Sequence, residues 1–184
     1  GIAKVLSCAP EDDKIAEVKV KVTSVSPAWT TQQLASWQEE DEELKPVVLA
    51  VRAGERPSAT DVKAWPSVTK RLMSDWERLK CVDDVVYREW YKVNGQLDRY
   101  QLVTPKQIRA QVLSVAHEGV VAGHFAERKT GKKVRELFYW PRLGTDVRDF
   151  CRSCLVCQKR KLHPKRPNFP LQQDMVGSPM DKVT

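Results

Sequence analysis

The amino-acid sequence predicts an α+β fold in which helices predominate. Hydrophobic residues make up 41% of the 184 residues, which is enough for a folded core and too many for a disordered chain. Asn94-Gly95 lies between two β-rich runs and predicts one β-hairpin. Apolar residues at helical spacing lie on both sides of that hairpin, so helices are expected to supply the rest of the fold.

The first 28 residues predict a linker or the tail of an upstream domain. Val18, Val20 and Val22 alternate with lysines, which is typical of an extended or strand-like segment. This segment lacks the hydrophobic region of a signal peptide. No apolar run in the chain approaches the roughly 18 residues of a membrane span, so no transmembrane helix is predicted.

Three short helices are predicted before the hairpin. Thr30 or Thr31 can cap the first of them. The second tolerates Pro46 only in its first turn and ends at Gly54. Apolar residues at helical spacing over Val68–Leu79 predict the third.

The hairpin completes a predicted unit of residues 29–103. Its strands are the runs Val85–Val93 and Gln96–Val103. Asn94 and Gly95 both tolerate positive φ, which a type I′ turn requires. We therefore expect a type I′ turn between the two strands.

Residues 104–163 predict a second helical unit, which carries most of the His and Cys residues. Its first helix starts at Thr104-Pro105, because Thr caps a helix and Pro is tolerated in the first turn. A second helix is predicted over Glu127–Phe138 and a third from near Thr145.

Positive charge concentrates in Val121–Arg166. This stretch holds 13 Lys and Arg against 4 Asp and Glu, a net charge of +9. The rest of the chain has 18 basic and 20 acidic residues, so the whole chain is +7. Such a local field favours a polyanion, most often nucleic acid. A solvated basic face without a partner explains the charge equally well.

His117, His124, Cys154 and Cys157 form the pattern that carries chemistry. Six residues separate the two histidines, and the cysteines form C-x2-C. Structural zinc takes four nitrogen and sulfur ligands in a tetrahedron. The C-x2-C pair can place both sulfurs on one ion, and a helix with its following turn can supply both imidazoles. We expect one structural Zn²⁺ per chain, with no open position for catalysis.

Alternatives remain for individual residues. A C-x2-C pair by itself also fits a redox pair or two small buried residues. Cys151 precedes Cys154 by three residues, so it competes as a ligand or faces the core. Cys8 and Cys81 have no partner motif and are expected to be lone thiols, and His163 is expected to be exposed. An odd total of five cysteines favours a reduced, metal-binding setting. Placing His before Cys excludes the ordinary C2H2 finger.

The stretch from His117 to Lys161 resembles the zinc-binding domain of retroviral and Ty3/gypsy-type retrotransposon integrases. The matching segments read HEGVVAGHFAERKT, then LFYWPRL, then DVRDFCRSCLVCQKRK. The resemblance implies a zinc-stapled HHCC domain of three to four helices. Gly131-Lys132-Lys133 stands where these relatives usually have stronger helix formers. Residues 29–103 resemble the helical N-terminal extension that precedes the domain in some of these integrases.

The resemblance implies a non-catalytic module of a retroelement integrase, encoded within a pol polyprotein. Such a module aids DNA-end binding and multimerisation during DNA integration. The catalytic core of these integrases follows the zinc domain and uses three carboxylates. After Cys157 this sequence has only Asp174 and Asp181, so we expect no catalytic residues and read residues 164–184 as a Pro-rich linker toward a missing core. The alternative is a domesticated, integrase-derived host protein that acts as a nucleic-acid or protein interaction module.

DNA is the expected partner, through its backbone phosphates. We also expect a homo-oligomer, because Phe138, Trp140 and Phe150 exceed what a small zinc unit readily covers, although the hairpin could cover them. No membrane and no small-molecule substrate are expected, and the predicted location is intracellular, in nucleus and cytoplasm. The candidate DNA contacts are Lys129, Lys132, Lys133, Arg135, Arg142, Lys159, Arg160, Lys161, Lys165 and Arg166.

Overall fold

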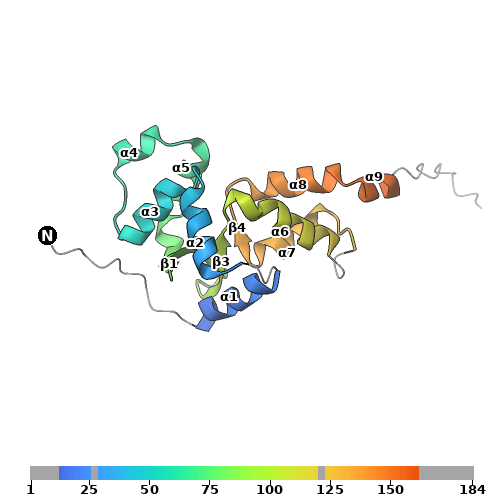
Figure 1. The fold of residues 1–184 in the computed structure, drawn as a ribbon, viewed down its shortest axis with the longest axis horizontal. Helices are drawn as coiled ribbons and strands as arrows, with labels where there is room; N and C mark the ends of the chain where they lie inside the picture. Colours follow the sequence, from blue (N-terminus) through green and yellow to red (C-terminus); the bar gives the residue numbers. More distant parts are fainter. Residues whose placement is uncertain (1–12, 26–28, 120–122, 162–184) are drawn as a thin grey trace, which may run out of the picture.

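The structure is a computed structural model that describes residues 13–25, 29–119 and 123–161. Within these ranges it is mostly helical with one small sheet, as predicted (Figure 1). No helix in the described ranges combines the length and hydrophobicity that a membrane crossing requires. In chain order the elements are α1 (Asp13–Val25), α2 (Thr31–Glu40), α3 (Lys45–Ala53), α4 (Ala59–Ala64), α5 (Ser67–Met73), the 3-10 turn η1 (Trp76–Arg78), β1 (Leu79–Val82), β2 (Val85–Tyr91), β3 (Leu97–Val103), α6 (Lys106–Glu118), α7 (Glu127–Arg135), β4 (Phe138–Tyr139), α8 (Leu143–Ser153) and α9 (Leu155–Lys161).

The four strands form one sheet in the order β1-β2-β3-β4. The first three pair antiparallel, and β4 pairs parallel with β3. The Leu102 amide donates to Leu137 O and the Thr104 amide to Tyr139 O, both at 2.8 Å. A strand from the second predicted unit therefore completes the sheet of the first. The unit boundary at residues 103 and 104 stays a prediction, and this strand pair crosses it.

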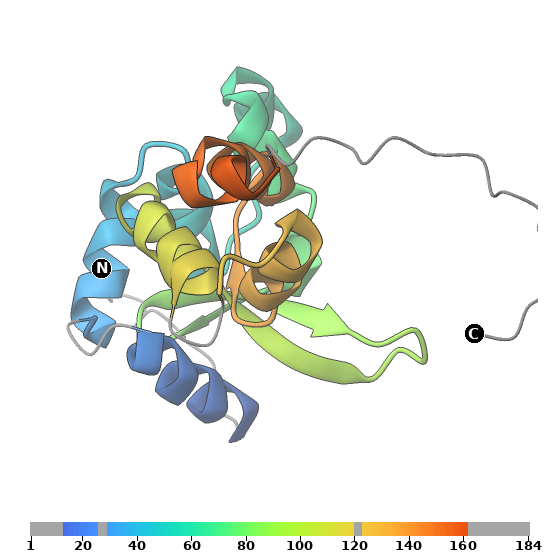
Figure 2. The ribbon, with the colours of Figure 1, turned by 90° about the vertical axis from the view of Figure 1, so that its right-hand side faces the viewer.

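The hairpin of β2 and β3 is confirmed, and it extends beyond the helices in Figure 2. Its turn type differs from the prediction. Gly95 has φ +77° while Asn94 is not among the residues with positive φ, and the Gly95 amide donates to Lys92 O at 2.9 Å. This is the three-residue loop that ends in a left-handed glycine. The two positive φ values of a type I′ turn occur instead at Asp83 and Asp84, +50° and +60°, between β1 and β2.

The expectation of an extended segment is wrong for residues 13–25, which form α1. Ile15, Val18 and Val22 are buried on one side of the helix, while Val20 is 69% exposed. The spacing of the buried residues is helical, and the buried side packs in the core that includes β3. Burial of this face against the sheet outweighs the local β preference of the valines.

Helix α2 starts where predicted, and α3 has Pro46 in its first turn and ends at Gly54 as predicted. Thr30 caps α2, and its side chain and that of Gln33 form a capping box. Pro46 lies in the first turn of α3, and Gly54 ends it in the left-handed conformation at φ +69°.

Two of the other predicted helices are shorter than expected. The helix predicted over Val68–Leu79 ends at Met73, because Leu79 pairs with β2 as the first residue of β1. The helix predicted over Glu127–Phe138 ends at Arg135, because Phe138 joins β3 as part of β4.

Two hydrophobic clusters lie on opposite faces of the sheet. Val85 and Leu102 face the larger cluster, which also holds the buried side of α1 and the inner faces of α6 and α8. Val86 and Val103 face the smaller cluster, which is built from α3, α5 and β1. Alternation along the strands thus separates the two clusters. The larger one spans both predicted units, so the sheet supports the helices that carry the His and Cys residues.

Candidate metal centre

Four elements bring the predicted ligands together. His117 lies in the last turn of α6, and His124 lies between α6 and α7. Cys154 is the C-cap of α8, and Cys157 lies in α9. One potential ligand atom from each residue lies within 4.8 Å of the other three. The structure therefore joins two pairs of residues that are far apart in the sequence.

The distances suit a tetrahedral zinc ion. His124 Nδ1 lies 3.3 Å from Cys154 Sγ, and His117 Nε2 lies 3.3 Å from Cys157 Sγ. Zinc bonds near 2.3 Å to sulfur and 2.0–2.1 Å to nitrogen give a nitrogen–sulfur edge of about 3.5 Å. The donors therefore already stand near their coordination spacing. Four protein ligands leave no position for water or substrate, so the bound Zn²⁺ is structural and the site non-catalytic.

A left-handed residue turns the second imidazole back toward the first. His124 has φ +59°, which is uncommon for residues other than glycine, although His is among those that adopt it more readily. Its backbone amide donates to His117 O at 2.9 Å. The two rings meet edge to face with centroids 5.2 Å apart. The backbone hydrogen bond thus sets the distance between the two nitrogen ligands.

A break between α8 and α9 presents the two sulfurs. Cys154 leaves the helical region with ψ 114°, and the chain re-enters a helix at Leu155. The Gln158 amide donates to Cys154 O at 3.0 Å. The Gln158 side chain donates to Arg152 O at 2.6 Å, so it satisfies a carbonyl in the last turn of α8. Both contacts hold the turn that carries the C-x2-C pair.

A hydroxyl group orients the fully buried His117. Its Nδ1 lies 3.4 Å from Thr130 Oγ1, and the Thr130 hydroxyl donates to Phe125 O at 2.9 Å. Because the hydroxyl hydrogen is already used, we assign Thr130 as the acceptor of an Nδ1–H hydrogen bond. This tautomer leaves the Nε2 lone pair for the metal. The sequence contained Lys129-Thr130 as part of the family resemblance, but it gave no signal for this role.

The competing cysteine belongs to the core. Cys151 is buried in the larger cluster, and its Sγ lies 3.5 Å from His117 Nδ1, the nitrogen that does not face the sulfur ligands. It is not in the four-residue group. The expectation of a lone thiol is wrong for Cys81, which is disulfide-bonded. Cys8 and His163 lie outside the described residues.

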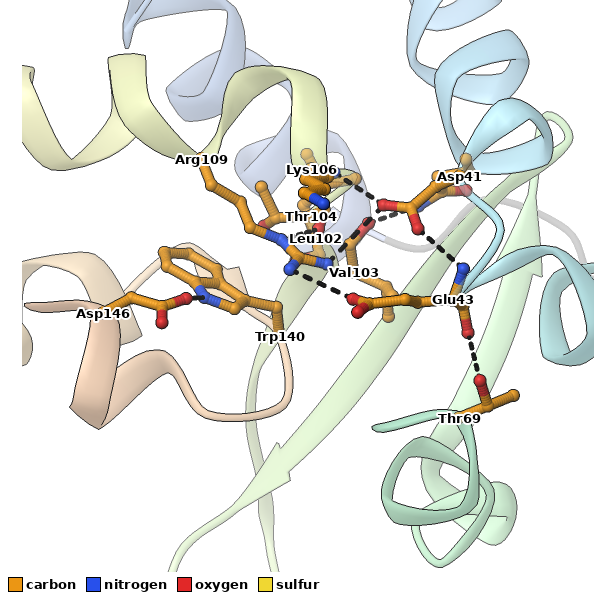
Figure 3. Close-up of polar contacts among 11 residues, drawn as sticks. Asp41, Glu43, Thr69, Leu102, Val103, Thr104, Lys106, Arg109, Trp140 and Asp146 are labelled. Atoms are coloured by element: carbon orange, nitrogen blue, oxygen red, sulfur yellow. Dashed lines mark hydrogen bonds and ion pairs between the residues drawn. The ribbon is translucent and has the colours of Figure 1, made fainter. Parts of the chain in front are cut away.

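Polar contacts connect α6 and α8, the helices next to the centre, to the α2–α3 corner (Figure 3). Asp41 Oδ2 accepts the Lys106 amide at 2.7 Å, so a carboxylate from the corner caps α6, whose own N-cap supplies no side-chain bond. Arg109 donates to Thr104 O at 3.1 Å and lies over the Trp140 ring at 5.8 Å. The Trp140 indole donates to Asp146 Oδ2 at 2.6 Å. No local pattern in the sequence predicted this set of contacts.

The basic residues predicted to contact DNA lie on two helices and one turn. Four lie on α7 and three on α9, with Arg142 just before α8. Lys129, Lys132, Arg135, Arg142, Lys159 and Arg160 are exposed, and Lys133 is half-buried. Lys165 and Arg166 lie outside the described residues. The α7 residues are Lys129, Lys132, Lys133 and Arg135, and the α9 residues are Lys159, Arg160 and Lys161.

The fold and site define a small helical zinc-binding domain with a closed His2Cys2 centre. Residues 104–163 match the family model described as the integrase zinc binding domain. This part of the chain is therefore similar to an integrase zinc-binding domain, both in sequence and in its set of His and Cys ligands. No solved structure is significantly similar to the chain.

Proposed function

We propose that this chain helps integrase subunits assemble on DNA ends. The observation that carries the proposal is the match of residues 104–163 to the integrase zinc binding domain, together with its closed His2Cys2 centre. A closed zinc site contributes to folding and has no open position for catalysis, so its role here is to hold a surface in place. The surface that it stabilises carries the chain's excess of positive charge.

The DNA contacts are the basic residues of α7, the α8 start and α9. Lys159 and Arg160 are exposed on a helix anchored by Cys157, one of the zinc ligands. Their charges interact with phosphates and do not read bases, so binding is expected to be weakly sequence-selective. Neutralising about four to six phosphates gives a log–log salt slope of roughly −4 to −5.

Fluorescence anisotropy with a short duplex at several salt concentrations tests this proposal. The variant Lys159→Glu/Arg160→Glu/Lys161→Glu is expected to bind every sequence more weakly and with a shallower salt slope. The matched control Arg56→Glu/Lys63→Glu/Lys70→Glu changes the net charge equally on exposed residues on and near α4 and α5, which lie on the opposite side of the molecule from α9 (Figure 1). Equal affinity of the two variants, or a slope near zero in the native chain, would refute DNA binding by these residues.

Self-association is the second part of the proposal. Phe138 and Trp140 do not support it, because both are buried within the chain and Phe138 packs edge-on against Trp29 at 6.4 Å. Leu155 and Val156 on α9 are 70% and 41% exposed and offer an apolar contact for a second copy. We expect a molecular mass that rises with concentration in light scattering. A monomer mass at all concentrations, unchanged in Leu155→Ser, would exclude this surface as an interface.

We further propose that the chain alone neither cuts nor joins DNA. The closed centre leaves no metal position for water or substrate. Strand transfer by the purified chain with Mg²⁺ or Mn²⁺ would contradict this.

The proposed location is intracellular, in nucleus and cytoplasm, where the DNA target lies. A reducing compartment keeps Cys154 and Cys157 available as thiolate ligands. The disulfide bond of Cys81 is the feature that this proposal does not explain, since a reducing compartment disfavours it, and alkylation of free thiols in intact cells tests whether Cys81 is reduced there.

A further inference from the structure

A hollow of about 240 Å³ beside the sheet is lined by four arginines and by no acidic residue of the described ranges. We call it the arginine pocket, after Arg71, Arg88, Arg135 and Arg142; Trp90 and Tyr139 also line it. A second hollow, lined by Arg56, Lys63 and Lys70, also has only basic charged residues, but it has fewer of them. The hollow beside α1, for comparison, mixes two lysines and an arginine with three carboxylates, so its charges balance.

Arg88 is the neutralised member of the four. It is buried on β2 and forms an ion pair with Asp75, with Nε 3.1 Å from Oδ2. Its guanidinium lies 4.1 Å from the Tyr139 ring centroid and 5.4 Å from that of Trp90. Arg88 therefore holds the two aromatic walls in place, and its own charge is compensated.

The other three arginines are not compensated. Arg71 comes from α5, Arg135 from the end of α7 and Arg142 from the residue before α8, and all three are exposed. Within the described ranges, none of their side chains has an ion-pair or hydrogen-bond partner. Three like charges converging from distant parts of the chain repel one another unless an anion lies between them. The convergence of these charges on one hollow therefore favours a bound anion.

Two glycines leave room for one of these arginines. A Cβ on Gly131 would lie 2.9 Å from Arg135 Nη1, and a Cβ on Gly144 would lie 3.3 Å from Arg135 Nη2. The Arg135 guanidinium thus lies against α7 and the first turn of α8. The N-terminal end of α8 carries a partial positive charge, which adds to the field of the pocket. Gly131, which departs from the helix formers of the relatives, does not interrupt α7.

We propose that the arginine pocket binds a phosphate group. The guanidinium fork matches phosphate oxygens in pairs, and the volume is below the about 300–1,000 Å³ of pockets for drug-sized ligands, so a small anion fits best. Trp90 is 40% exposed at the pocket and can stack on a sugar or base attached to that phosphate. The phosphate belongs either to a DNA strand, which rests on the proposed function, or to a free small phosphate, which does not.

The first test uses inorganic phosphate alone. The zinc-loaded chain, labelled with ¹⁵N, is titrated with phosphate against chloride at constant ionic strength. The Trp90 indole signal and the Arg71 side-chain signal should shift and saturate. In Arg71→Gln/Arg135→Gln/Arg142→Gln the Trp90 shift should disappear, while Arg56→Gln, an exposed arginine outside the pocket, should keep it. Because all three pocket arginines are exposed, an unchanged melting temperature should accompany the loss.

The second test separates the two sources of phosphate. Arg71 is not among the basic residues of the proposed DNA surface, so Arg71→Gln isolates the pocket. If the phosphate belongs to DNA, this variant should weaken duplex affinity by roughly threefold to tenfold and reduce the salt slope by about one, while Arg56→Gln changes neither. Saturable phosphate binding with unchanged DNA affinity in Arg71→Gln would assign the pocket to a free phosphate.

Absence of a saturable phosphate shift, with Arg71→Gln and Arg56→Gln equal in DNA affinity, would overturn the proposal. DNA binding through α7 and α9 would still stand after that result, provided that Lys159→Glu/Arg160→Glu/Lys161→Glu weakened DNA binding. Loss of the α9 contribution with an intact phosphate shift would refute the proposed DNA surface and keep the pocket. The two proposals therefore fail separately.

Discussion

The helices α5 and α9 are both seven residues long, and neither length is stable alone in water. In α5, Thr69, Leu72 and Met73 are buried, and Leu72 and Met73 belong to the smaller cluster. In α9, no side chain that the structure describes is buried, and Leu155 is 70% exposed. Apolar burial therefore holds α5, whereas metal ligation through Cys157 holds α9. One chain stabilises equally short helices in two physically different ways.

Removing the metal is expected to have the largest effect. That effect should fall on the zinc-binding unit that contains α9 and leave α5 intact. Strong chelation, Cys154→Ser or His117→Ala should abolish helicity within residues 104–161, because metal binding supplies folding free energy there, on the scale of about 10–16 kcal/mol in zinc-finger peptides. Hydrogen exchange should show α5 still protected. Metal analysis should find one zinc per chain. A chain without metal that kept its melting temperature in chelator would contradict the interpretation.

Loss of core volume should instead destabilise the region around α5. Leu72→Ala removes a fully buried side chain from the smaller cluster and should cost about 2–5 kcal/mol in the free energy of unfolding. Urea denaturation measures the loss, and zinc content should stay unchanged. The control is Leu49→Ala, where the side chain is 42% exposed and the cost should be far smaller. Loss of zinc together with α5 would show that the two regions unfold as one.

A smaller effect is expected when the hydrogen bond that orients the zinc ligand His117 is removed. Thr130→Val keeps the shape but removes the hydroxyl that accepts from Nδ1–H. Zinc affinity should fall about tenfold to a hundredfold, measured by competition with a chromophoric chelator. Thr130→Ser retains the hydroxyl and should retain most of the affinity. Equal affinities for the Val and Ser variants would remove Thr130 from the metal site.

The contact between the α2–α3 corner and α6, which joins the two predicted units, can be weakened at Asp41. Asp41→Asn reduces the charge that caps α6 and that faces Arg109, whose Nη2 lies 3.6 Å from Oδ2. Nη2 is buried and has no hydrogen bond among the described residues, so loss of the nearby charge should cost about 1–3 kcal/mol. Hydrogen exchange should accelerate at the start of α6. In an Arg109→Met background the same substitution should cost less, and an equal cost would show that the two residues are not coupled.

The smallest expected effect is a pH dependence at Tyr139, on the strand that joins the two regions. Burial, and then the hydrogen bond to Asp75, raise the pKa of Tyr139 to about 12. The folded chain holds this proton more tightly than the unfolded chain, whose tyrosine pKa is about 10. The resulting stabilisation is complete below pH 10 and is lost as the pH rises to 12. Between pH 10 and 12 the melting temperature of Tyr139→Phe should therefore fall less than that of the native chain. Parallel curves of melting temperature against pH for the two proteins would contradict the raised pKa of Tyr139.

The features that the sequence predicted well are set by residues near one another. Spacing selected His117, His124, Cys154 and Cys157, because zinc ligands must reach one ion from two short segments. The N-cap Thr30 and the left-handed Gly54 mark helix ends through bonds within a single turn. Local chemistry is sufficient for each helix end and for each pair of ligands, whereas bringing the two pairs together requires the tertiary structure.

Only the tertiary structure decided where local preferences compete. The valines of α1 favour a strand alone and form a helix because the larger cluster buries Val18 and Val22. Phe138 leaves a helix because β3 offers its edge. The arginine pocket exists because α5, α7 and the start of α8 meet beside the sheet. Each outcome depends on burial or pairing with residues tens of positions away, and the free energy of those contacts cannot be read from neighbours in the sequence.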